Sequence, residues 1–123
     1  MQNFQKIIVT GAGGWLGCSL LNHLSGLVKE PGTVFHNSEI VGLIQDNESK
    51  KLLSEFDIVL LKGDLRSENT INELLKDAEG AVIFNLAGII HPTIFGQRAF
   101  NEVNHLAMEN FAQKCADRGV RKF

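Results

Sequence analysis

Short apolar runs alternate along this chain with stretches in which apolar positions recur every three or four residues. The runs are rich in Ile, Val and Leu, a pattern typical of strands buried on both faces. They predict strands at residues 6–10, 40–44, 58–61 and 81–84. The helical spacing predicts helices at residues 16–28, 67–76 and 98–117, with a short helix near 46–51. Ser67 is a predicted helix cap, and Gly119 a predicted helix end.

The order of these elements, β-α-β-(α)-β-α-β-α, is typical of βαβ units with right-handed crossovers. It predicts an α/β fold built on a doubly wound parallel sheet. Residues 120–123 resemble the first residues of a fifth strand, so we expect an incomplete sheet of four strands plus the start of a fifth. Such a sheet has an open edge, through which the chain could pair with a second copy as a homodimer.

Charge and composition narrow the range of partners. The net charge is −2 and the isoelectric point about 6.1, so there is no basic excess to bind nucleic acid or an anionic membrane surface. No apolar stretch approaches the ~20 residues of a membrane span, and we see no secretory signal. Cys18 and Cys115 form no CxxC pair, which argues against a metal site and favours free thiols in the cytoplasm.

The segment between the first predicted strand and the first predicted helix holds glycines in the spacing GxxGxxG, at Gly11, Gly14 and Gly17. Here Gly11 would allow a tight turn, Gly14 would let a pyrophosphate approach the backbone, and Gly17 would let the helix approach the sheet. The N–H groups near Gly14, Trp15 and Leu16 are expected to lack intrahelical acceptors at the positive end of the helix dipole. No Lys follows in the loop, which excludes a Walker A phosphate loop. The pattern predicts a site for NAD or NADP.

The residues after the second predicted strand bear on how the adenosine ribose is held. Asp46 follows this strand and could bind the ribose hydroxyl groups, or it could cap the next helix. Lys50 and Lys51 could meet a 2′-phosphate, or they could lie on a solvated helix face. The sequence leaves both pairs of alternatives open, and with them the choice between NAD and NADP.

Taken together, the motifs resemble those of a known family. The glycine loop from Thr10 to Gly17 is similar to the TGxxGxLG loop of extended short-chain dehydrogenases/reductases, the NAD-dependent epimerase/dehydratase family of nucleotide-sugar enzymes. Gly63-Asp64-Leu65 resembles the family's G-D-[LV] motif after the third strand, whose Asp binds the adenine amino group. The resemblance implies a Rossmann-like fold and implies that Asp64 and Leu65 bind the cofactor.

Two further motifs extend the resemblance to the second half of the chain. Residues 85–88, Asn-Leu-Ala-Gly, resemble the H-x-A-[AG] motif that lies along the cofactor, with Asn85 in place of the commoner His. A Val-Asn pair ending at Asn104 resembles the family's V-N, whose Asn hydrogen-bonds near the active site. The resemblance implies that Ala87, Gly88 and Asn104 lie beside the cofactor, although packing alone would also favour small residues at 87 and 88.

The family's acid/base is the Tyr of a Tyr-x-x-x-Lys pair, and this chain contains no Tyr, so we assign no catalytic residue. Hydride transfer from a carbinol needs such a base at the oxygen atom. We therefore expect residues 1–123 to be the N-terminal part of an NAD(P)-binding Rossmann domain, with the catalytic and substrate portions absent from this chain. By the resemblance, the longer enzyme would be an epimerase, dehydratase or reductase that transfers a hydride on a nucleotide-sugar.

Two other functions are compatible with the same motifs. The chain could belong to a non-catalytic regulatory module that senses NAD(P), which would bind the dinucleotide without turning it over. It could also belong to a reductase of steroid-like or flavonoid-like carbonyls. Those enzymes share these N-terminal motifs and differ in the half of the protein that binds the substrate.

Overall fold

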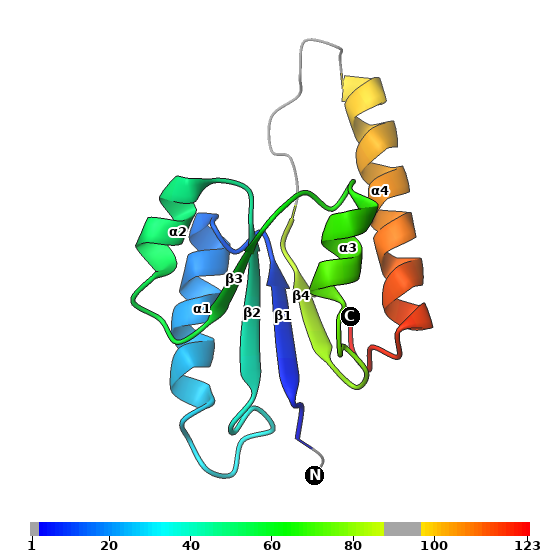
Figure 1. The fold of residues 1–123 in the computed structure, drawn as a ribbon. Helices are drawn as coiled ribbons and strands as arrows, with labels where there is room; N and C mark the ends of the chain where they lie inside the picture. Colours follow the sequence, from blue (N-terminus) through cyan, green and yellow to red (C-terminus); the bar gives the residue numbers. More distant parts are fainter. Residues whose placement is uncertain (1–2, 88–96) are drawn as a thin grey trace.

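The computed structural model describes residues 3–87 and 97–123, apart from the side chains of residues 48, 49, 52 and 97–104. Strands and helices alternate along the described chain (Figure 1). The strands are β1 (Lys6–Thr10), β2 (Glu39–Ile44), β3 (Val59–Lys62) and β4 (Val82–Asn85). The helices are α1 (Trp15–Leu27), α2 (Asn47–Leu53), α3 (Glu68–Leu74) and α4 (Gln97–Asp117).

The strands form one parallel sheet in the order β3-β2-β1-β4. The register places Ile8 of β1 beside Val41 of β2 on one side and Ile83 of β4 on the other. Beyond β4, Val82 pairs in parallel with Lys122, so the last residues begin a fifth strand at this edge. The expected Rossmann-like α/β fold, with four strands and the start of a fifth, is confirmed.

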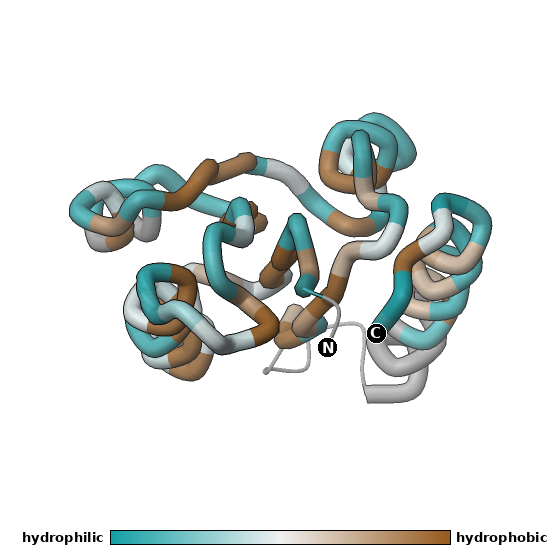
Figure 2. The backbone as a smooth tube through the Cα atoms, turned by 90° about the horizontal axis from the view of Figure 1, so that it is seen from below, coloured by the Kyte–Doolittle hydropathy of each residue, from teal (hydrophilic) through white to brown (hydrophobic). Residues whose placement is uncertain are grey.

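Helices cover both faces of the sheet, with α1 and α2 on one face and α3 and α4 on the other (Figure 1). Alternation along β1 sends Ile7 and Val9 into the core beneath α1, while Ile8 enters the core beneath α3 and α4. Figure 2 shows hydrophobic residues on the strands and on the helix sides that face them. Burial on both faces explains why the strands are continuous apolar runs.

The ends of the elements follow from pairing and capping. β3 and β4 begin and end one residue later than predicted, and in β4 the shift follows from the ladder with β1, where Thr10 lies beside Asn85. Ser67 caps α3 as predicted, because its side chain accepts the N–H of Thr70. Gly119, at a φ of 77°, ends the turn after α4, a conformation that favours glycine.

Candidate functional site

The glycine loop leaves β1 at the carboxyl end of the sheet, where dinucleotides bind in open α/β folds. Gly11 has a φ of 65°, and a Cβ there would lie 2.6 Å from the carbonyl oxygen of Leu86. The N–H of Ala12 donates to the carbonyl oxygen of Leu43 at 3.0 Å, which ties the loop to the end of β2. Position 11 therefore requires glycine for its conformation and for its close approach to the backbone after β4.

Gly17 and Gly14 differ in what surrounds them. A Cβ on Gly17 would lie 2.3 Å from the carbonyl oxygen of Gly11 and 2.8 Å from Cα of Ala12, so α1 packs directly on the loop. A Cβ on Gly14 would meet only the carbonyl oxygen of Gly11, at 3.6 Å, which is an ordinary contact. The fold thus requires glycine at positions 11 and 17, whereas the space beside Gly14 is open.

That open space lies at the N-terminus of α1, a helix of thirteen residues with no acidic side chain in its first turn. Trp15 and Leu16 are 80% and 51% exposed, and their N–H groups belong to the first turn, which has no intrahelical acceptors. The N–H of Gly14 also has no partner within the helix, but it donates to the carbonyl oxygen of Gly11 in the preceding turn at 3.2 Å. The positive end of this helix and its first N–H groups suit an anion such as a pyrophosphate.

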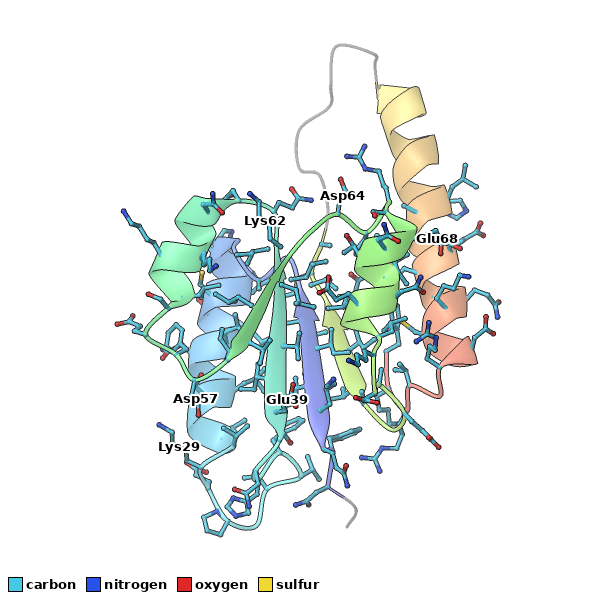
Figure 3. The ribbon with its side chains drawn as sticks, viewed as in Figure 1. Lys29, Glu39, Asp57, Lys62, Asp64 and Glu68 are labelled. Atoms are coloured by element: carbon cyan, nitrogen blue, oxygen red, sulfur yellow. The ribbon has the colours of Figure 1, made fainter. Side chains whose placement is uncertain are left out.

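Asp46 lies at the same edge of the sheet, after the end of β2 and directly before α2. It is exposed, as are Lys50 and Lys51 in the last turn of α2. Lys62, at the end of β3, donates to the side-chain oxygen of Asn47 at 3.3 Å, which places another cation near this edge (Figure 3). Both roles of Asp46, ribose binding and helix capping, remain compatible with this position.

Asp64 follows β3 at the same edge (Figure 3), and its carboxylate is held by Arg66. Nε of Arg66 lies 3.1 Å from each carboxylate oxygen, Nη2 lies 2.6 Å from Oδ2, and the backbone N–H of Arg66 donates to Oδ1 at 2.8 Å. The hydrogen bonds from Arg66 hold the pKa of the Asp64 carboxyl below its ordinary value. Sequence reasoning missed Arg66, although the Asp-x-Arg spacing was the available signal.

The turn that carries Asp64 is packed closely onto α3. A Cβ on Gly63 would lie 2.4 Å from Oγ1 of Thr70, and that hydroxyl accepts the N–H of Asp64 at 3.3 Å. Leu65, predicted to bind the cofactor, places its side chain in the core beneath α3, where it is 5% exposed. Only the backbone of Leu65 is therefore available to a ligand.

A buried threonine joins the ends of β1 and β4. Oγ1 of Thr10, a residue with no exposed surface, donates to Oδ1 of Asn85 and accepts the N–H of Ala87 at 3.1 Å. Nδ2 of Asn85 in turn donates to Sδ of Met108 in α4 at 3.2 Å. This network places Ala87 beside the glycine loop, close to the turn at Gly11. Thr10 is a positioning residue: it belongs to the TGxxGxLG-like motif, but the sequence analysis assigned it no role of its own.

Two predicted site residues are not described in full. Gly88 lies outside the described residues. Asn104 lies in α4, but its side chain is outside the description. Of the predicted cofactor residues, the structure therefore brings together those of the glycine loop and Ala87, and it places Asp46 and Asp64 at the same edge of the sheet.

A second hollow lies at the opposite, amino-terminal end of the strands. It is a groove of about 430 Å³ between α3 and the sheet, lined by residues that include Lys6, Glu39, Val59 and Glu73. Ligands of open parallel sheets bind beyond the carboxyl ends of the strands. We therefore assign the candidate site to the glycine loop and not to this groove.

The described side chains contain no cluster of three or more His, Cys, Asp or Glu that could hold a metal ion. Among the residues that the structure describes, we find no helix with the length and hydrophobicity needed to span a bilayer. In the described part of the chain, the glycine loop and its neighbours therefore form the arrangement best suited to bind a ligand.

Comparison with known proteins agrees with this arrangement. The model of a protein family described as "NAD dependent epimerase/dehydratase family" matches residues 7–123. The chain belongs to this family. The cofactor of this family member is NAD or NADP, as the glycine loop predicted, and the open space beside Gly14 suits a dinucleotide pyrophosphate.

Relatives of this epimerase/dehydratase family member are longer proteins. The protein named "Uncharacterized protein y4nL" of Sinorhizobium fredii is 30% identical over 121 residues, which are 98% of this chain and 33% of that protein. The chain therefore spans about a third of the length of this relative.

Solved structures share the fold. An ADP-L-glycero-D-manno-heptose-6-epimerase of Helicobacter pylori superposes with a TM-score of 0.70 at 20% identity, over 98% of this chain and 38% of that one. A triphenylmethane reductase of Citrobacter, crystallised with NADP(H), superposes with a TM-score of 0.63 at 23% identity, over 94% of this chain and 34% of that one. Epimerases and reductases thus share this α/β architecture.

Proposed function

We propose that this chain is the N-terminal, dinucleotide-binding part of a longer enzyme that transfers a hydride between NAD(P) and a small-molecule substrate. The observation that carries the proposal is the open space beside Gly14 at the start of α1, between two glycines that the fold itself requires. The same position borders the first turn of α1, whose N–H groups have no intrahelical acceptors. Family membership over residues 7–123 supports the same conclusion.

The described residues have distinct tasks in this proposal. The first-turn N–H groups of Trp15 and Leu16 bind the pyrophosphate, and Asp46 binds the ribose. The Asp64 carboxylate and the Leu65 backbone bind the adenine. The cofactor, when bound, supplies or accepts the hydride. Gly88 and Asn104, together with Ala87, complete the nicotinamide side by their place in the family motifs.

For the substrate we propose a nucleotide-sugar. Support comes from the sugar-nucleotide epimerase of Helicobacter pylori, which superposes at least as well as the Citrobacter reductase. Membership of an epimerase/dehydratase family is compatible with such a substrate. A carbonyl reductase is the second candidate, and it rests on the reductase structures among the neighbours. A module that senses NAD(P) without catalysis is the third.

Two further parts of the proposal concern the protein in the cell. We propose that the enzyme works in the cytoplasm, which the free thiols of Cys18 and Cys115 support. We propose a homodimer as its assembly, and sedimentation of the full-length protein tests this. A monomer at micromolar concentration would contradict it.

Calorimetric titration of the full-length protein with NAD and NADP tests the cofactor site. Gly14→Val fills the open space and Asp64→Ala removes the adenine acceptor, so each should weaken binding about tenfold or more. Gly26→Ala, in the same helix with no atom within 4 Å of the added Cβ, is the matched control and should bind like the wild type. Unchanged affinity in both site variants would overturn the assignment.

A turnover assay of the full-length protein distinguishes the three candidate functions. Oxidation or reduction of the nicotinamide is followed by absorbance in the presence of nucleotide-sugars and, separately, of aromatic or steroid-like carbonyls. Turnover with the first group supports the epimerase/dehydratase proposal, and turnover with the second alone favours the reductase. Tight dinucleotide binding with no turnover on either group favours the sensing module.

A further inference from the structure

The contact between Asp64 and Arg66 uses most of the hydrogen-bonding capacity of the carboxylate. Oδ1 accepts the backbone N–H of Arg66 and shares Nε, while Oδ2 accepts Nη2 at 2.6 Å. Three N–H groups of Arg66 thus occupy an ionised carboxylate that has about four acceptor sites, so roughly one site remains free. The Asp64 side chain is 39% exposed, and a ligand can therefore reach that remaining site.

The backbone around Asp64 is held as firmly as its side chain. Its N–H donates to Oγ1 of Thr70, and its carbonyl oxygen accepts the N–H of Ser67 at 2.9 Å. Ser67 also caps α3, so the turn is continuous with the start of that helix. With the backbone fixed, the direction of the carboxylate depends on the planar guanidinium of Arg66, which contacts both oxygens.

We propose that Arg66 is a positioning residue that makes this site selective for the adenine base, an inference that rests on the proposed function. It holds the Asp64 carboxylate so that its one free acceptor site faces the exocyclic amino group of the bound purine. A carboxylate accepts hydrogen bonds and donates none when ionised. A purine that carries a carbonyl oxygen in place of the amino group therefore meets two acceptors facing each other and is rejected.

Two other roles for Arg66 would give different binding results. If Arg66 blocked the carboxylate and had to leave before the base entered, its removal would raise the affinity for NAD. If Arg66 only stabilised the turn, its removal would weaken the binding of every dinucleotide by the same factor. The direction of the change in NAD affinity therefore distinguishes positioning from blocking. The change in base selectivity distinguishes positioning from a purely structural role.

The experiment is calorimetric titration of the full-length protein with NAD and with nicotinamide hypoxanthine dinucleotide, in which a carbonyl oxygen replaces the amino group of adenine. The variants are Arg66→Ala, Arg66→Lys and, as a charge-matched control, Lys29→Ala, which lies just after the carboxyl end of α1 (Figure 3). We expect the wild type and Lys29→Ala to prefer NAD about tenfold or more. Arg66→Ala should lose most of that preference through weaker binding of NAD, and Arg66→Lys should be intermediate.

Thermal unfolding of each variant shows whether it is folded, and Arg66, at 57% exposure, is not needed by the core. An unchanged preference in Arg66→Ala would overturn the proposal, as would tighter binding of NAD. A wild type that binds both dinucleotides equally well would also overturn it and would leave the proposed function standing. A wild type that binds neither of these dinucleotides nor NADP would overturn the proposed function itself.

Discussion

Replacement of Gly17 by alanine tests how closely α1 approaches the glycine loop. The added Cβ would lie 2.3 Å from the carbonyl oxygen of Gly11 and 2.8 Å from Cα of Ala12. Both are backbone atoms, so the contact can be relieved only by moving α1 away from the loop. Overpacking of this kind costs about 3 kcal/mol at the upper end of its usual range.

Part of that cost is offset, because alanine favours the helical conformation over glycine by about 1 kcal/mol. The net expectation for Gly17→Ala is a loss of about 2 kcal/mol in the free energy of unfolding. For a chain of this size the loss corresponds to a melting temperature that is lower by about 8 °C. Thermal unfolding followed by circular dichroism measures the difference directly.

Gly26→Ala is the matched control, since Gly26 lies in the same helix and no atom lies within 4 Å of its added Cβ. That variant gains the helical preference without a clash, so its melting temperature should equal or exceed that of the wild type. Equal melting temperatures for Gly17→Ala and Gly26→Ala would refute the reasoning, because they would show that the clash does not exist.

Three further predictions concern a buried hydroxyl, a buried thiol and a helix cap. Thr10→Val leaves the N–H of Ala87 without its acceptor and should lower the free energy of unfolding, measured in urea, by about 2 kcal/mol. Thr10→Ser keeps the hydroxyl and should retain most of that free energy. Burial raises the pKa of the Cys115 thiol to about 11, so the free energy of unfolding should fall as pH rises from about 9 toward 11, because the unfolded chain releases this proton first. A pH dependence unchanged in Cys115→Ala would contradict this. Ser67→Ala removes the acceptor for the N–H of Thr70 and should cost about 1 kcal/mol by the same urea assay, with no loss if the cap is not formed.

Local patterns predicted the elements because strands buried on both faces and amphipathic helices leave different periodicities. They were less accurate at the ends. β4 was expected one residue too early, since its limits are set by the ladder with β1 and not by its own apolar run. The cap at Ser67 was predicted correctly, because a cap depends on residues within one turn of each other.

The candidate site, too, could be predicted from the sequence only in part. The spacing of Gly11, Gly14 and Gly17 predicted a dinucleotide loop, and family membership confirmed the cofactor as NAD or NADP. The sequence also predicted a tight turn at Gly11, an open position at Gly14 and a close helix approach at Gly17, but it could not predict which atom of another segment Gly11 faces. The carbonyl oxygen of Leu86 lies against Gly11, and that residue is far along the chain in the segment after β4.

The sequence by itself determined the order of strands and helices, the parallel sheet and the position of the glycine loop, since each follows from residues close together in the chain. Only the tertiary structure decided that Thr10 holds Ala87, that Gly11 lies against Leu86 and that Arg66 contacts both oxygens of Asp64. The physical reason is that hydrogen bonds and steric contacts depend on register and side-chain direction, to within less than an ångström. Local periodicity carries no information at that scale.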